Sequence, residues 1–339
     1  MCNIAGYVGE EPAAPILLEM IQAQEGLAGG YYSGLAVLTE GEVRHCKVVG
    51  DCTVLRESLG GMTLPGRVGV AHSRSNSGGD SRWAHPFVVG RALAYVANGS
   101  VGCFEDELDL EAEARRLKDA GHRFTAVAEK QVGRYPRLPD GRCVHMSDVM
   151  AHAIANRMGD GAQPLSAIED AFLCLPSEIA GLFITYSHSA ALFGARFNMP
   201  VCVGRDGRGA YVASSPCGFP ETVREWRWIP PWSVAEITFA QTQVRPLGDG
   251  STGGRDDIDR REARECILEL LADGEAATCG RMIEAVGGLA VEDGPVVACD
   301  PTYEVLHELE SEGRVRRDRR RVAGPIPGVP AATFEFTLA

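Results

Sequence analysis

A series of short apolar segments between residues 3 and 239 places the strongest constraint on the fold. Each segment is rich in Val, Ile, Ala or aromatic residues and ends near Gly, Asn or Asp, as strands closed by turns do. The segments are NIAGYVG, SGLAVLTEG, VRHCKVVGD, RVGVAHSR, ALAYVANGS, AGLFITYS, AALFGAR, PVCVGRD, GAYVASS and WSVAEITF. Helices are expected at 14–24, 105–120 and 148–157, where apolar residues recur every three to four positions. We therefore expect a layered α+β architecture with largely antiparallel sheets.

Length and charge restrict the class of protein. The chain has 339 residues and a net charge of −13, which argues against a surface that binds nucleic acid or anionic lipid as a whole. No apolar run approaches the length of a membrane span, and the first residues lack the features of a secretory signal. We expect a cytoplasmic protein without a membrane partner.

Cysteine spacing and glycine spacing argue against bound metals and nucleotides. The 11 cysteines include no CxxC pair, so neither a disulfide framework nor a zinc site is indicated. Glycine pairs such as the one in GGYYSG have the wrong spacing for a phosphate loop or a dinucleotide fingerprint. We expect no metal and no cofactor.

A segment of linker composition, PLGDGSTGGRDD, divides the chain. It predicts domains at 2–245 and 258–339, with a linker at 246–257. In the second domain, helices are expected at 258–271 and 278–286, and a third is expected within CDPTYEVLHELESEG.

Helix ends in the second domain can also be predicted. Thr278 suits an N-cap, Asp300 suits the cap of the third helix with Pro301 at its first position, and Gly313 should end it. The segments RVRRDRRRVAG and ATFEFTL alternate like a hairpin. Helices followed by a terminal hairpin resemble a small winged-helix domain.

Cys2 follows the initiator methionine, and this position has chemical consequences. Methionine aminopeptidases remove Met1 when the next side chain is small, which would leave a cysteine at the amino terminus. An α-amine has a reference pKa of about 7.7 to 8.0, so it can act as a base for its own thiol and later as an acid for a leaving group. The alternative is an ordinary buried cysteine.

Several motifs follow Cys2 in an order that resembles the class II glutamine amidotransferases. CNIAGYVG is similar to their Cys-Gly-Ile start, GGYYSGLAVL to their Arg-Gly-Tyr-Asp-Ser-Ala-Gly segment, and GVAHSRSNSGG to their His-Thr-Arg-Trp-Ala-Thr-His-Gly loop. AHP, ANGS, ASSPCGF and VAEITF follow in family order. The resemblance covers roughly residues 2 to 240 and is strongest to the glutaminase domain of glucosamine-6-phosphate synthase. It implies the four-layer αββα sandwich of an N-terminal nucleophile (Ntn) hydrolase.

The resemblance also implies roles for individual residues. Cys2 would attack the side-chain amide of glutamine and release ammonia. The side-chain amide of Asn98 and the backbone N–H of Gly99 would form the oxyanion hole. Arg74 would bind the α-carboxylate of the substrate in fork geometry.

Seen alone, these residues have plainer interpretations. An Asn-Gly pair is common in turns, and Arg74 could be a surface arginine. His72 and His85 are expected to be structural residues satisfied by backbone groups.

The sequence departs from the family at the substrate clamp. Asn3 stands where the family has glycine, Gly29 where it has arginine, and Ser75 where it has tryptophan. Asn76 and Ser77 replace a Thr-His pair that helps to hold the carboxylate, and we expect them to line the substrate site.

A further departure concerns the aspartate that binds the substrate ammonium group in a Ser/Thr-Asp-Thr-Glu motif. The nearest segment, HMSDVMAHAI, places Met146 at that position in an ungapped reading. Asp148 serves instead if the inserted loop at 133–142 shifts the register. The changes leave the nucleophile and the oxyanion hole intact and thin the clamp, so glutamine hydrolysis, hydrolysis of another amide and an inactive scaffold all stay open.

The second domain is too short for the synthase domains that the family usually carries, so we expect the ammonia acceptor to be a separate synthase subunit. RVRRDRRR (314–321) could contact phosphates from a wing, but the glutamates of PTYEVLHELESEG would then face a polyanion. This favours a wing that docks a synthase or a homodimer mate over one that binds DNA. The alternative function is a ligand-sensing transcriptional regulator or a scaffold built on a diverged amidotransferase domain.

Overall fold

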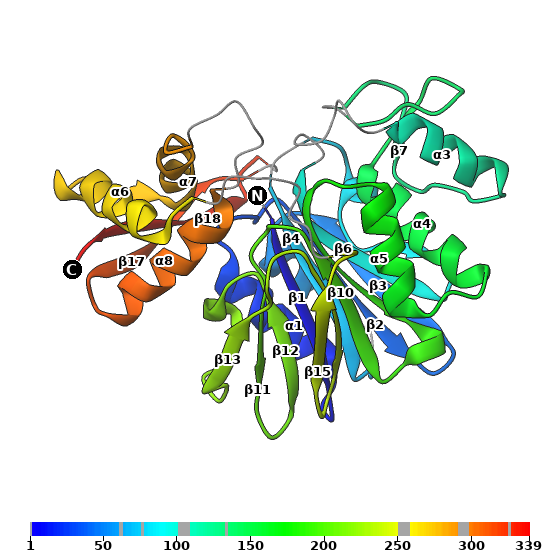
Figure 1. The fold of residues 1–339 in the computed structure, drawn as a ribbon, viewed down its shortest axis with the longest axis horizontal. Coiled ribbons are helices and arrows are strands. Elements are labelled where there is room, and N and C mark those ends of the chain that lie inside the picture. Colours follow the sequence, from blue (N-terminus) through cyan, green and yellow to red (C-terminus); the bar gives the residue numbers. More distant parts are fainter. Residues whose placement is uncertain are drawn as a thin grey trace.

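Two large β-sheets packed face to face form the centre of the described part of the molecule (Figure 1). The computed structural model describes residues 2–60, 64–75, 78–100, 109–132, 135–249, 258–290, 298–324 and 327–339.

The first sheet places the N-terminal strand at its centre. Its strands, in hydrogen-bonding order, are β13 (Glu225–Trp228), β11 (Cys202–Arg205), β12 (Gly209–Ala213), β1 (Asn3–Gly9), β4 (Val68–Arg74), β2 (Tyr32–Thr39) and β3 (Glu42–Val49). On β1, Ile4 and Val8 pack between the sheets, while Ala5 and Tyr7 pack against the helices outside. Because both faces are buried, β1 reads as a nearly continuous apolar run.

The second sheet lies against the first through small and branched side chains. Its order is β15 (Thr242–Pro246), β14 (Ser233–Thr238), β10 (Ala191–Arg196), β9 (Glu178–Thr185), β6 (Leu93–Ser100) and β5 (Phe87–Val89). Val96 and Leu182 contribute to the apolar layer between the sheets. A Cβ atom at Gly6 would lie only 3.0 Å from Leu192 Cδ1, so glycine allows the sheets to approach here.

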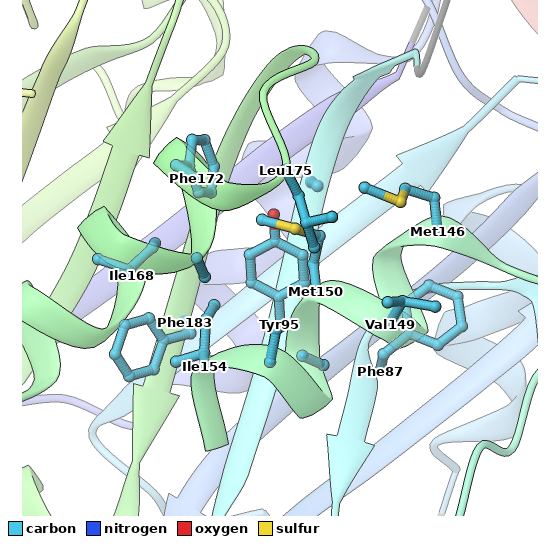
Figure 2. Packing of buried hydrophobic residues seen from close by; sticks show 14 of the residues in the cluster. Phe87, Tyr95, Met146, Val149, Met150, Ile154, Ile168, Phe172, Leu175 and Phe183 are labelled. Carbon is cyan, nitrogen blue, oxygen red and sulfur yellow. The ribbon is translucent and has the colours of Figure 1, made fainter. Parts of the chain in front are cut away.

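Helices cover both outer faces. The first sheet carries α1 (Ala13–Gln24) and α2 (Cys52–Ser58), and the second carries α3 (Leu110–Asp119), α4 (Met146–Gly159) and α5 (Pro164–Cys174). Figure 2 shows Val149 and Met150 of α4 and Phe172 of α5 packed above Tyr95 and Phe183. A small ribbon of β7 (Val127–Ala128) and β8 (Cys143–Val144) precedes α4. Over the described residues this is the expected αββα sandwich.

The C-terminal elements form a module with its own apolar core, centred on residues such as Ile267, Leu306 and Phe336. The elements are α6 (Arg260–Ala272), β16 (Ala277–Thr278), α7 (Cys279–Gly287), α8 (Cys299–Ser311), β17 (Val315–Ala323) and β18 (Pro330–Leu338), with sheet order β16-β18-β17. The expected helices and hairpin are therefore present, and the winged-helix assignment stays a prediction.

Helix ends in this module agree with the sequence in two places and differ in one. The Thr278 hydroxyl accepts from the Arg281 N–H at 3.3 Å, and Gly313 follows α8 with φ +67°. Asp300 does not cap α8, because the N-cap is Ala298. The Asp300 carboxylate instead pairs with Arg196 of β10, an almost fully buried arginine of the second sheet.

The C-terminal module also contacts the amidotransferase-like domain near the end of α1. The Phe334 N–H of β18 donates to the Gly26 carbonyl at 2.8 Å, and Leu27 belongs to the core of the module. The rings of Trp226 on β13 and His307 on α8 lie 4.8 Å apart. The module is thus attached by hydrogen bonding, apolar burial and a buried ion pair together.

The glutamates of α8 are largely neutralised within the module. Arg260 pairs with Glu304, Arg264 pairs with Glu312, and Arg317 pairs with Glu310. α8 packs against α6 on one side. On its other side, His307 of α8 lies against Trp226 of the first sheet (Figure 1).

The buried ion pair between Arg196 and Asp300 generates a stability prediction. Asp300→Ala leaves a buried guanidinium without its partner, which costs about 3 to 5 kcal/mol. Glu265→Ala removes an exposed carboxylate 3.9 Å from Arg261 and should cost less than about 1 kcal/mol. Urea denaturation of both variants measures the difference, and equal losses would show that the buried pair does not hold the module.

Candidate active site around Cys2

Cys2 lies just before β1 and faces the second sheet. Its nitrogen donates to Asn98 Oδ1 on β6 at 3.0 Å, and the residue is 8% exposed. Met1 precedes Cys2 in this chain, so the donor is a peptide nitrogen that removal of Met1 would convert into the α-amine. This hydrogen bond joins the amino-terminal strand of one sheet to a strand of the other.

Asn98 is fully buried, and its two amide atoms have different roles. Oδ1 is occupied by the Cys2 nitrogen, whereas Nδ2 has no hydrogen-bond partner among the described residues. An unsatisfied buried donor costs about 1 to 3 kcal/mol, which is the cost of a donor kept ready for a ligand. Gly99 follows, exposed and with φ +139°, a conformation that glycine adopts readily. The structure thus brings together three of the residues singled out from the sequence.

Arg74 ends β4 beside Cys2. Asn3 pairs with Ser73 in the sheet, so the next residues outward on the two strands are Cys2 and Arg74. Arg74 is 2% exposed and therefore not a surface arginine.

The Arg74 guanidinium is held in place on one side. Nη1 donates to the carbonyls of Gly78 and Trp83 at 3.0 and 3.2 Å, and the group lies over the Tyr32 ring. Nη2 has no regular hydrogen-bond partner in the described chain. Such a fixed guanidinium with one free edge suits a carboxylate.

His72 interacts directly with the Cys2 thiol. Burial, the largest single influence, raises the pKa of this thiol, but the hydrogen bond and charge of His72, the charge of the chain terminus and the Ser75 backbone together lower the pKa to about 6. His72 was expected to be a structural residue satisfied by backbone groups, and its Nε2 does bond the Ala97 carbonyl at 2.8 Å. Its place beside Cys2 follows from strand register, because Ile4 pairs with His72 and side chains two residues apart share a face.

Aromatic and histidine rings surround this pair. The His85 ring stacks on His72 with centroids 3.8 Å apart, and His145 lies 5.5 Å from His85. Burial lowers the pKa of both His85 and His145 well below the usual range, so they are neutral at physiological pH. Tyr135, from the inserted loop, shares a 3.1 Å hydrogen bond with His145 Nε2 and interacts with Arg74.

Asp148 lies in the first turn of α4 and is fully buried. Its Oδ2 accepts from the N–H groups of Thr125 and Ala126 at 2.6 and 2.7 Å, and Oδ1 lies 3.6 Å from His152 Nε2. Oδ2 is therefore engaged by the backbone, whereas Oδ1 has no hydrogen-bond partner among the described residues, and ammonium binding by Asp148 stays a prediction. Met146, its ungapped counterpart, is buried at the start of α4.

Asn76 and Ser77 lie outside the described residues. Within the described ranges, no group of three or more His, Cys, Asp or Glu side chains could hold a metal ion. The described helices also include none that is long and apolar enough to cross a membrane.

A buried polar network at the end of α1 holds the residue that follows Cys2 in place. Asn3 Nδ2 donates to the carbonyls of Gln24 and Ala28 at 2.9 and 2.6 Å, which explains a side chain where the family has glycine. Glu25 Oε1 accepts from the hydroxyl of Ser73 at 2.9 Å and also from Ser33 and the Cys52 N–H. Burial raises the pKa of Glu25 to about 7.

Glu25 should therefore make folding stability fall with pH. Its folded pKa of about 7 lies above an unfolded value of about 4.3, so its ionisation between these values favours the unfolded chain. Glu25→Gln keeps an acceptor and removes the titration. Wild type should lose stability relative to this variant by up to about 1.4 kcal/mol per pH unit in that window, measured by urea denaturation from pH 4 to 8. The exposed Glu57→Gln should show no such slope, and a flat difference for Glu25→Gln would refute the assignment.

Comparison with known proteins agrees with this geometry. No protein-family model matches the chain. The glutamine–fructose-6-phosphate aminotransferase (isomerizing) of Gluconobacter oxydans is 29% identical over 242 residues, covering 70% of this chain and 36% of that protein. The Helicobacter pylori protein of the same name is 30% identical over 243 residues, with the same coverage of 70% and 36%. The chain thus spans about a third of the length of these relatives.

Solved structures extend the likeness to the fold. The glutamine phosphoribosylpyrophosphate amidotransferase of B. subtilis superposes with a TM-score of 0.58 at 17% identity, covering 94% of this chain and 66% of that one. At this identity the likeness concerns the fold alone. Taken with the curated relatives, it shows that this chain carries a class II glutamine amidotransferase domain with the Ntn-hydrolase fold.

Proposed function

We propose that the protein, once Met1 is removed, hydrolyses the side-chain amide of glutamine or a related amide and releases ammonia. One observation carries the proposal. The Cys2 nitrogen occupies Asn98 Oδ1, so the Asn98 Nδ2 donor stays unpaired next to the nucleophile. An amide donor fixed in this way is what a developing oxyanion requires.

The reaction follows from this placement. The Cys2 sulfur attacks the amide carbon, and the charge that develops on the carbonyl oxygen is stabilised by Asn98 Nδ2 and the Gly99 N–H. Loss of ammonia leaves a thioester on Cys2, and water then releases the acid. The donors are held in place before the reaction, so little reorganisation accompanies the charge.

Substrate selection is proposed to depend on the free edge of Arg74, with Asn76 and Ser77 lining the same site. The start of α4 offers Met146 in the place of a carboxylate, and one of the two Asp148 oxygens is already engaged by the backbone of Thr125 and Ala126. Without a strong acidic partner, discrimination for a free ammonium group should be weak. We therefore propose that amides with a modified or absent amino group are accepted alongside glutamine.

The partner is proposed to be a separate synthase subunit that receives ammonia. Residues 258–339 would form a winged-helix-like docking domain for that subunit or for a second copy of this chain. The enclosure of α8 between α6 and the first sheet supports protein docking over insertion into a DNA groove.

The nucleophile assignment predicts complete loss of activity in Cys2→Ala. Removal of Met1 still proceeds before alanine, so the variant isolates the thiol. Free ammonia should be measured with glutamine, asparagine and γ-glutamyl amides, after mass spectrometry confirms the amino terminus. Cys174→Ala, which alters an exposed cysteine on α5, should retain full activity. Equal ammonia release by Cys2→Ala and wild type would contradict the proposal.

The two binding assignments predict different kinetic effects. Asn98→Ala should lower kcat by about 10² to 10³-fold, because one oxyanion donor is lost. Arg74→Lys should mainly raise KM for substrates that carry an α-carboxylate, since an ammonium group cannot reproduce the fork. Steady-state kinetics with glutamine and with an amide lacking the carboxylate separates the two, and an equal KM effect on both substrates would argue against carboxylate binding.

A further inference from the structure

We propose that the C-terminal module positions the nucleophile. Its strands β17 and β18 bind a short segment at the end of α1, and the same segment holds Asn3, the neighbour of Cys2. The consequence for turnover rests on the proposed function, whereas the effect on the start of β1 can be measured without any substrate.

The module binds residues 22–28, which we call the connecting segment, through two carbonyl groups. The Gln22 carbonyl accepts from Arg319 Nη1 of β17 at 3.2 Å. The Gly26 carbonyl accepts from the Phe334 N–H of β18 at 2.8 Å. Carbonyls in the last turn of a helix lack an intrahelical partner, so Arg319 supplies a donor that the backbone of α1 cannot.

The contact at Gly26 is close as well as polar. Gly26 has φ +126°, and a Cβ atom there would lie 2.8 to 2.9 Å from carbons of the Phe334 ring. Leu27 belongs to the core of the module. On β18, Phe336 pairs with Ala277 of β16, and N–H groups two residues apart point to the same edge of a strand. Gly26 therefore lies beside β16, along the same edge of β18.

The connecting segment also orients Asn3, which is fully buried. Asn3 Nδ2 donates to the carbonyls of Gln24 and Ala28 at 2.9 and 2.6 Å, which uses both hydrogens of the amide. Asn3 Oδ1 has no hydrogen-bond partner in the described chain. A second link runs from Gln24 Nε2 to the Ile4 carbonyl at 3.3 Å. The two residues that follow Cys2 are thus held by the connecting segment.

The carbonyls of the connecting segment alternate between the two sets of donors. Those of residues 22 and 26 bind the module, and those of residues 24 and 28 bind Asn3. Each peptide unit is a rigid plane, so a displacement of one carbonyl reorients the units next to it. A movement of β18 therefore moves the acceptors of Asn3.

The module is anchored at the same time to the sheet that carries the oxyanion donor. Asp300 of α8 pairs with Arg196 of β10. Ala180 of β9 pairs with Asn98 on one side and with Arg196 on the other, and directly paired side chains share a face. Arg196 and Asn98 therefore lie in one row, with Cα atoms about 10 Å apart by ordinary strand spacing. The module thus bridges the strand of the nucleophile and the sheet of Asn98.

This bridge bears on the distance between Cys2 and Asn98. The Cys2 nitrogen lies 3.0 Å from Asn98 Oδ1. A displacement of about 1 Å at a reacting group can lower a rate by about 10²-fold. Asn3 and Phe334 are therefore positioning residues, which act through the placement of Cys2 and not on the reacting atoms.

The decisive variant is Phe334→Leu, which loosens the contact at Gly26. Its matched control is Phe336→Leu, at a buried phenylalanine two residues along β18 in the same core. Ammonia release from glutamine should show a kcat about 10- to 10²-fold lower in Phe334→Leu and close to wild type in Phe336→Leu. KM should change little, because other carbonyls hold the Arg74 guanidinium. Equal losses of kcat in the two variants overturn the proposal, since they would reflect only the stability of the module.

A double variant tests the route through Asn3. Asn3→Ala removes the donor to the carbonyls of residues 24 and 28. Adding Phe334→Leu to Asn3→Ala should lower kcat by less than about threefold further, because the link is already cut. A kcat loss equal to the product of the two single effects overturns the route.

Hydrogen–deuterium exchange of the peptide covering residues 2–9 provides a readout without turnover. Exchange should be about tenfold faster in Phe334→Leu than in Phe336→Leu, which corresponds to about 1.4 kcal/mol of local stability. Equal exchange in the two variants overturns the proposal. Faster exchange in a protein whose wild type releases no ammonia from any amide contradicts the proposed function and supports the coupling between the module and β1.

A surface variant replaces Phe334→Leu if thermal denaturation shows that it does not fold. Arg319→Ala removes the exposed donor to the Gln22 carbonyl. Its control is Arg320→Ala, whose partner is Glu335 of the module itself. Faster exchange of the N-terminal peptide in Arg319→Ala than in Arg320→Ala supports the proposal, and equal exchange overturns it.

Discussion

The hydrogen bond from the Cys2 nitrogen to Asn98 Oδ1 is the interaction on which the site depends. It crosses from one sheet to the other, so its geometry is set by the packing of the whole sandwich and not by a flexible loop. The bond fixes the orientation of the Asn98 amide, and the nitrogen of that amide is a donor without a partner in the described chain. A rigid core thus keeps an unsatisfied amide donor close to Cys2.

Much of the fold could be predicted because its strands carry a strong local signal. β1, β4 and β6 are apolar on both faces and end at polar or glycine residues, so their existence follows from sequence alone. α2 and α5 escaped prediction, since α2 is only one and a half to two turns long by ordinary helix geometry and α5 follows a loop without a side-chain cap. Asp300 looked like a helix cap, but a long-range partner, Arg196, decided its role.

The site was predictable to the extent that it follows order along the chain. Cys2, Asn98, Gly99 and Arg74 could be placed because each belongs to a motif at a strand end. The place of His72 beside Cys2 could not be predicted, because it arises from register between β1 and β4 and from the Ala97 carbonyl on the other sheet. Asp148 has the right residue type, but local sequence does not reveal that the Thr125 and Ala126 amides bind its Oδ2, and its role toward a substrate stays a prediction.

The C-terminal module binds the same short segment that holds Asn3, the neighbour of Cys2. The Gly26 carbonyl receives the Phe334 N–H, while Gln24 and Ala28 on either side of it receive Asn3, the residue next to Cys2. The C-terminal module and the strand that follows Cys2 therefore meet in one short segment. The most direct test of the central claim is a crystal structure of the Met1-processed protein after reaction with a glutamine analogue that carries a diazoketone in place of the amide. The account predicts an adduct on Cys2 whose carbonyl oxygen accepts from Asn98 Nδ2 and the Gly99 N–H. An adduct whose oxygen points away from both donors would contradict it.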